Sequence, residues 1–147
     1  RNLPDEPGVA GKVFEALGDV EVIVDMIVQS KGQAGKASIS FTVAQESART
    51  AYDKLLQLMQ KEWQEATIEL DKDIAKLSVV GEGMRTHAGV ASKMFQVLGE
   101  EGINVDMITT SEIKISVAIK EKYSELAVRV LHECFIENAG KNLSFNQ

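Results

Sequence analysis

The sequence predicts the α+β fold class, as two ferredoxin-like βαββαβ domains whose antiparallel sheets carry helices on one face. Two observations support this. Residues 8–27 align without a gap onto residues 89–108, and eleven of the twenty paired positions are identical. The segments that follow each copy also predict elements in the same order. A duplicated unit of this length is one small domain made twice, not a solenoid repeat.

The second copy gives the clearer pattern. Its first strand alternates and is β-branched, and its first helix has apolar residues three and four positions apart. Gly99 and Gly102 suit the end of that helix, where a left-handed residue is favoured. A strictly alternating strand and a second amphipathic helix follow. The predicted strand, helix, two strands and helix span 76–80, 90–98, 103–109, 113–119 and 123–134.

The first copy follows the same order and adds a closing strand. Its predicted helix, two strands, helix and closing strand span 9–17, 20–28, 37–44, 47–62 and 66–70. The link over residues 29–36 is rich in Gly and Lys, so we expect it to be mobile. Across this link the alignment offset falls from 81 to 74, which predicts seven more residues in the first copy.

These patterns divide the chain into domains at 1–70 and 74–147, separated by a short turn. Only residues 1–3 stand where the second copy has its first strand, so we expect a truncated first strand and a chain cut from a longer polypeptide. Residues 142–145 are a short candidate for the last strand of the second domain. We expect that strand to be missing or supplied by an absent N-terminal segment. Domains this small bury only about 60% of their unfolded surface, so we expect them to lean on each other or on a partner.

Composition excludes several classes of protein. The 147 residues carry a net charge of −6, which counts against nucleic acid or an anionic membrane as partner. A single cysteine rules out an internal disulfide and any Cys-rich metal site, and no metal is expected. No membrane span or signal peptide is visible. We therefore expect a cytoplasmic location.

No catalytic arrangement is visible. His132 is expected on a helix surface, Cys134 as a small apolar residue in a core, and His87 in a loop, where it is either solvated or near a ligand. No phosphate-binding glycine motif follows a strand. We therefore predict no enzymatic site in this chain.

The loop before the first helix is a better candidate for binding. Pro7 suits the first helical turn, and Gly8 lets another group approach the backbone. Free N–H groups at a helix start bind a carboxylate, and Asp5 offers a partner for an ammonium group. Together these groups match a free α-amino acid. The alternative is that Asp5 or Glu6 simply caps the helix.

A second candidate is a carboxylate on an apolar strand, which occurs in both copies as Asp25 and Asp106. Each is followed by Met-Ile. The functional interpretation is ligand binding. The alternative is a charge that protects an edge strand against aggregation.

Three stretches carry a family resemblance: the loop and helix at 2–17, the run at 81–119, and within it the Thr-Ser-Glu-Ile-Lys-Ile-Ser element at 110–116. With the duplication, they resemble the paired ACT domains at the C-terminal end of aspartate kinase. The resemblance implies a regulatory region or β subunit that senses threonine and/or lysine for feedback inhibition and forms a homodimer through its ACT domains. It implies no cofactor in this chain, and a catalytic domain or α subunit elsewhere that phosphorylates aspartate with Mg-ATP.

The resemblance also implies two effector sites, each shared between copies. The threonine-type site would use Asp5, Gly8, Ala10 and Gln29 of the first copy with Asn104 and Val105 of the other. The lysine-type site would use His87, Ala91, Ser111 and Glu112 with Asp25.

The two sites cannot be chemically equivalent. Asp5 has Thr86 as its counterpart, and Asn104 has Ile23. Ala91 also stands where some lysine-sensing members carry a hydroxyl residue. Two alternatives stay open: an ACT-type regulator of another amino-acid biosynthetic enzyme, and a ferredoxin-like interaction or RNA-binding module without a small ligand. The acidic charge and the lack of aromatic residues at strand centres count against the second.

Overall fold

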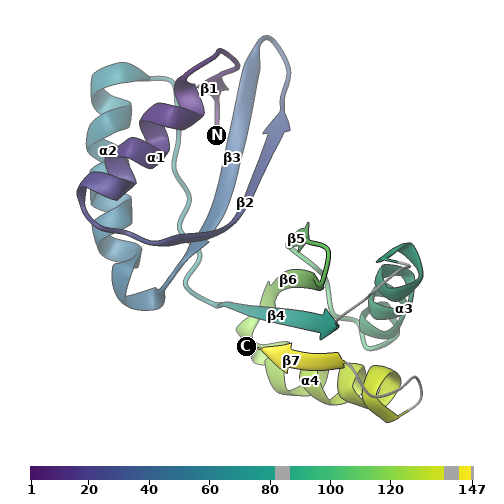
Figure 1. Cartoon of the computed structure of the whole chain (residues 1–147). Helices are drawn as coiled ribbons and strands as arrows, with labels where there is room; N and C mark the ends of the chain where they lie inside the picture. Colours follow the sequence, from purple (N-terminus) through teal and green to yellow (C-terminus); the bar gives the residue numbers. More distant parts are fainter. Residues whose placement is uncertain (82–86, 138–142, 147) are drawn as a thin grey trace. The chain divides into compact units, whose positions relative to one another are not determined.

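The computed structural model describes residues 1–81, 87–137 and 143–146. The chain forms two compact units, Arg1–Lys72 and Asp73–Gln147. Each unit is an antiparallel sheet with helices, as Figure 1 shows. The predicted α+β class is confirmed.

The first unit has two helices packed side by side over a three-stranded sheet with strand order β1-β3-β2 (Figure 1). The edge-on contact of Phe14 in α1 with Phe41 in β3, at 5.7 Å between ring centroids, marks the face of the sheet that the helices cover. Its elements are β1 (Leu3–Pro4), α1 (Val9–Asp19), β2 (Val24–Lys31), β3 (Lys36–Val43), a short 3-10 turn η1 (Gln45–Ser47) and α2 (Ala48–Glu62).

The second unit has a four-stranded sheet with strand order β5-β6-β4-β7. Five consecutive residues of β6 are buried, because this strand has a neighbour on each side. The elements are β4 (Ile74–Gly81), α3 (His87–Glu100), β5 (Met107–Thr110), β6 (Lys114–Lys120), a 3-10 turn η2 (Glu121–Tyr123), α4 (Ser124–His132), a π-helical turn η3 (Glu133–Glu137) and β7 (Leu143–Asn146).

The side chains of the two cores differ in how completely they are buried. In the first unit the sheet residues Ile39, Phe41 and Val43 are only partly buried against the helices. In the second, Leu77, Val79 and their neighbours on β6 are completely buried. Beyond Ala37, β3 pairs with β2 alone, whereas β6 pairs with β4 on one side and with β5 on the other.

Two predictions about closing strands are wrong. Residues 66–70 do not form a strand. Among the described residues, their backbone hydrogen bonds are a turn from the Ala66 N–H to the Trp63 carbonyl, at 3.1 Å, and two bonds between Thr67 and Arg1, at 3.0 and 2.7 Å. The last strand of the second unit is not missing: β7 pairs with β4 from Gly81↔Leu143 to Ser78↔Asn146.

The link between β2 and β3 is shorter than predicted. Residues 29–31 belong to β2 and Lys36 to β3, so the turn is confined to 32–35. Gln45 and Ala48, which begin η1 and α2, have their counterparts 76 positions later in Glu121 and Ser124. With the offset of 81 before the link, the first copy has five extra residues, not the predicted seven. The sequence alignment had slipped by one period of the strand, which keeps the alternation intact.

Candidate functional site

The loop that enters α1 is held to the β2–β3 turn. The Asp5 N–H donates to the Gly35 carbonyl at 2.9 Å, which ties the two loops together. Gly8 has φ = 89°, a left-handed conformation that glycine adopts without steric cost. The Lys12 N–H donates to the Gly8 carbonyl at 3.1 Å, so the helix begins directly after this glycine.

The start of α1 has the properties of an anion site. Within residues 1–81, no side chain hydrogen-bonds to its N-terminus, so neither the Asp5 nor the Glu6 side chain caps the helix, although the Val9 N–H donates to the Glu6 carbonyl at 3.4 Å. The first N–H groups of a helix lack partners within the helix and carry its positive dipole end. Asp5 and Gly8 are exposed, and Ala10 is half-buried. A carboxylate can therefore reach the amides while a cation approaches Asp5.

Gln29 belongs to the same end of the first unit. It pairs with Ile39, and directly opposed residues point to the same face of a sheet. Ile39 packs into the core under the helices, so the exposed Gln29 projects from the helix-covered face. Leu3 and Lys31 both pair with Ala37, so the ends of β1 and β2 lie level. The first unit thus gathers all four of its predicted threonine-type residues at one end.

Asn104 and Val105 lie in the connection from α3 to β5. The Ile103 N–H donates to the Leu98 carbonyl at 2.9 Å, and Gly102 has φ = 69°, which together end the helix and turn the chain. Asn104 is exposed, and Val105 packs partly against the core. This side of the second unit is where we predicted its contribution to the threonine-type site.

The second unit's lysine-type residues surround the other end of β5. Ser111 and Glu112 are exposed in the turn between β5 and β6, where the Ser111 N–H donates to the Lys114 carbonyl at 2.7 Å. The Gly81 N–H donates to the Ile113 carbonyl at 2.8 Å, so β4 ends beside this turn. His87 opens α3, but its side chain lies outside the described residues, as does all of Thr86.

Ala91 and Asp25 complete that predicted set. Ala91 is half-buried in the first turns of α3 and packs against the core. Asp25 is exposed near the start of β2, opposite Thr42, at a bulge in the pairing with β3. The Thr42 hydroxyl donates to the Asp25 carbonyl at 2.9 Å. Asp25 therefore has a fixed backbone and an exposed carboxylate.

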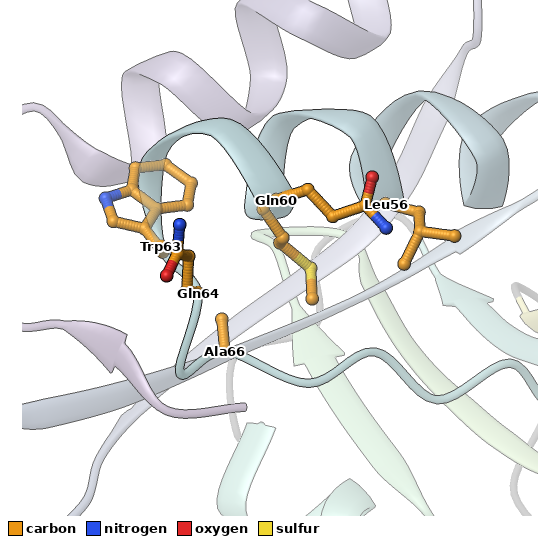
Figure 2. A pocket seen from close by; sticks show the side chains of 6 residues that line it. Leu56, Gln60, Trp63, Gln64 and Ala66 are labelled. Carbon is orange, nitrogen blue, oxygen red and sulfur yellow. The ribbon is translucent and has the colours of Figure 1, made fainter.

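One hollow was not expected from the sequence. A cavity of about 330 Å³ is lined by the last turns of α2 and the residues just after it, with Trp63 at its edge (Figure 2). Its lining residues are Leu56, Met59, Gln60, Trp63, Gln64 and Ala66. None of them belongs to a predicted site. The only sequence signal was the lone tryptophan after an amphipathic helix.

The described residues contain neither a metal-binding cluster nor a membrane-spanning helix. Over the described ranges, no three His, Cys, Asp or Glu side chains are placed to hold a metal ion. No helix in the part of the chain that the structure describes has the length and hydropathy to cross a membrane. The candidate ligand-binding sites are therefore the loops at the ends of the two sheets.

Comparison with known proteins places the chain in a family. The family model for the ACT domain matches residues 1–57 and 77–135, one match in each unit. The chain belongs to the ACT domain family. The two matches coincide with the two copies of the repeat, so each copy is one ACT domain.

The resemblance to the regulatory region of aspartate kinase is also confirmed. The aspartate kinase of Pseudomonas fluorescens is 48% identical over 135 residues, which are 92% of this ACT chain and 32% of the relative. The chain thus spans about a third of the length of the curated relatives it matches.

Two solved structures are similar over nearly their whole length. One, of aspartokinase alpha and beta subunits, has a TM-score of 0.84 at 47% identity and covers 92% of this chain and 88% of that one. The ligand-free regulatory subunit of aspartate kinase from Thermus thermophilus has a TM-score of 0.84 at 38% identity, with the same coverage. The ACT pair described here therefore matches aspartate kinase regulatory subunits in fold and extent.

Proposed function

We propose that this ACT pair is the amino-acid-sensing regulatory part of an aspartate kinase. It binds L-threonine and/or L-lysine at interfaces between ACT copies and mediates feedback inhibition of aspartate-family biosynthesis. One observation carries the proposal. The loop before α1 combines an exposed carboxylate, Asp5, with an uncapped helix start behind the left-handed Gly8. This combination complements the ammonium and carboxylate of an α-amino acid.

In the threonine-type site each group has a separate role. Asp5 binds the ammonium, the backbone N–H groups of Gly8 and Ala10 bind the carboxylate, and the Gln29 amide bonds the ligand hydroxyl. Asn104 and Val105 of another ACT copy close the site. The first unit supports this assignment because its four residues lie at the same end of the sheet.

In the lysine-type site, two carboxylates suit a ligand with two ammonium groups. Asp25 and Glu112 are both exposed, and each would bind one of these ammonium groups. Ser111 lies beside Glu112, and α3 begins with His87 and reaches Ala91 one turn later.

Packing between ACT copies has support in exposed apolar side chains. Ile27 on β2 and Ile108 on β5 are counterparts in the repeat, and they are 51% and 45% exposed. Both strands are edges of their sheets, with backbone groups available for a neighbour. We propose that these edges contact other ACT copies, in a homodimer that creates the effector sites.

Regulation then follows from differential binding. An effector that binds one arrangement of the dimer more tightly shifts the population toward it. The favoured arrangement would hold the attached catalytic domain, or a separate α subunit, in an inactive state. The kinase chemistry and its Mg-ATP belong to that catalytic part, so this chain itself is not an enzyme. The proposed location is the cytoplasm, where amino acids are made.

Calorimetric titration of the chain with L-threonine, L-lysine and L-methionine tests the proposal. We expect heat with threonine or lysine, alone or together, and none with methionine at the same concentrations. The absence of both heat and thermal shift with threonine and lysine, singly and combined, would contradict amino-acid sensing by this chain.

A further inference from the structure

The tripeptide Asp-Met-Ile occurs once in each ACT domain, and its two copies differ in backbone conformation. Met26 has φ = 39°, whereas Met107 is not among the described residues with positive φ. A side chain in the left-handed region crowds the neighbouring carbonyl, so such a residue persists only where its surroundings hold it. Met26 is also buried, at 5% exposure.

Two hydrogen bonds hold the Met26 conformation. Asp25 and Met26 together face Thr42 at a bulge, and the pairing resumes at Ile27↔Phe41. The Met26 N–H donates to Asp25 Oδ1 at 2.9 Å, and the Thr42 hydroxyl donates to the Asp25 carbonyl at 2.9 Å. Backbone and carboxylate of Asp25 thus both stabilise the bulge.

The second ACT domain has different groups at these positions. Ala118 takes the place of Thr42, so no hydroxyl reaches the aspartate carbonyl. The Asp106 N–H instead donates to the Ala118 carbonyl at 2.8 Å, and the Asp106 carboxylate lies 3.7 Å from Lys120 Nζ. Pairing of β5 with β6 begins only at Met107. Val105 therefore precedes the pairing, whereas its counterpart Val24 is already paired with β3.

The same tripeptide thus adopts two arrangements on equivalent scaffolds. In the first domain the methionine is left-handed and the valine before the tripeptide is paired, and in the second domain neither holds. The described side-chain contacts that distinguish them are the two hydrogen bonds at Asp25 in the first domain and the Asp106–Lys120 ion pair in the second. A small gap between two packings is the requirement for a switch that a ligand can bias.

We propose that the Asp25–Met26 bulge is a two-state element through which an amino-acid ligand at Asp25 changes the edge strand β2. The inference rests on the proposed function, in which Asp25 binds a ligand ammonium. That ammonium competes with the Met26 N–H for Oδ1. In the bound state Met26 leaves the left-handed region, and Val24 separates from β3 as Val105 does from β6. This change in backbone conformation also moves Ile27, the next residue, whose exposed apolar side chain lies on the edge strand β2.

Carbon-13 chemical shifts of methionine Cα and Cβ test the proposal on the full chain, because these shifts distinguish left-handed from extended backbone. Met26 is assigned through Met26→Leu. We expect left-handed shifts without ligand and a change toward extended values on saturation with L-lysine. Asp25→Asn retains an oxygen acceptor for the Met26 N–H but loses the charge, so it should keep the left-handed shifts and weaken lysine binding at least 10-fold. The matched variant Asp106→Asn should respond to lysine as the unmodified chain does.

The outcomes separate this inference from the proposed function. Lysine-induced changes at the Ser111 and Glu112 amides while Met26 keeps left-handed shifts would overturn the switch and leave lysine sensing intact. No lysine-induced change at any residue, in a sample that still responds to L-threonine at Gly8, would overturn the switch together with the lysine-type site. An equal loss of response in Asp25→Asn and Asp106→Asn would also contradict a role specific to Asp25.

Discussion

Glu21 in the first ACT domain and Gly102 in the second occupy the same left-handed position after the first helix. Their φ angles are 59° and 69°. The Glu21 N–H donates to the Gly18 carbonyl and the Gly102 N–H to the Gly99 carbonyl, both at 3.0 Å. The helix ending, not the residue, therefore dictates the conformation. Glycine adopts this left-handed conformation without strain, whereas glutamate does not.

Replacing Glu21 by glycine should stabilise the protein. Glycine removes the steric cost of the left-handed conformation in the folded state, but it also increases the conformational entropy of the unfolded chain. We expect the first effect to be larger, with a gain of up to about 1 kcal/mol in the free energy of unfolding. Gly102→Ala is the reciprocal change and should cost about 1 kcal/mol. Urea unfolding followed by far-ultraviolet circular dichroism measures both. A loss of stability in Glu21→Gly would show that the glutamate side chain makes a compensating contact.

The serine pair in the second sheet should be strongly coupled. Ser78 on β4 and Ser116 on β6 are each 1% exposed, and their hydroxyl oxygens are 2.7 Å apart. Ser116→Ala leaves the Ser78 hydroxyl buried without this partner, at an expected cost of about 1–3 kcal/mol. Replacing both serines by alanine should cost less than the sum of the single changes. A double-mutant cycle by urea unfolding measures the coupling, and strict additivity would contradict it.

A surface ion pair gives the first unit a specific response to acid. The Lys36 ammonium, 2.9 Å from Glu65, holds the pKa of that carboxyl below its ordinary 4.5. A lowered folded-state pKa means that the stabilisation is fully present above the unfolded-state pKa and is lost as the pH falls through the folded-state value. Glu65→Gln should thus be slightly less stable than the unmodified chain near neutral pH and equal to it in strong acid. A stability difference independent of pH would contradict the assignment.

Asp5 should be essential for threonine binding but not for folding. Asp5→Ala removes the carboxylate that binds the ligand ammonium, and loss of a charge-assisted hydrogen bond should lower affinity at least about 10-fold. The side chain is exposed, so the circular dichroism spectrum should not change. Glu6→Ala is the matched control, because Glu6 is also exposed and acidic but has no assigned contact. Equal affinities in the two variants would remove Asp5 from the site.

The sequence predicted most elements because their apolar periodicity was intact, and it failed where pairing depends on a neighbour. Residues 66–70 read as a strand, yet only Thr67 is paired, through Arg1. The strand predicted over 103–109 begins at Met107, because the end of α3 holds the Ile103 N–H. In both cases the outcome depends on hydrogen bonds to residues outside the segment for which a strand was predicted.

For the candidate sites, the sequence predicted residue types but not the contacts that hold them. Gly8 directly precedes α1, but Pro7, which we expected in the first helical turn, lies two residues before the helix. The hydrogen bond from Asp5 to Gly35 was not predicted, because the Gly/Lys-rich link suggested mobility. The bulge at Met26 was equally invisible, since identical residues in the second copy adopt another conformation. Such features depend on the partner strand, not on the segment itself.

A charge on the exposed edge of β2 should weaken self-association. Ile27 is 51% exposed on an edge strand, so lysine there leaves the core unchanged but opposes the approach of another edge. Gln57→Lys adds the same charge on an exposed face of α2 and is the matched control. Sedimentation velocity over a range of concentrations should show a weaker dimer only for Ile27→Lys. Association that is equally strong in both variants would mean that the dimer uses a surface other than β2, and would leave the exposure of Ile27 without the role proposed for it.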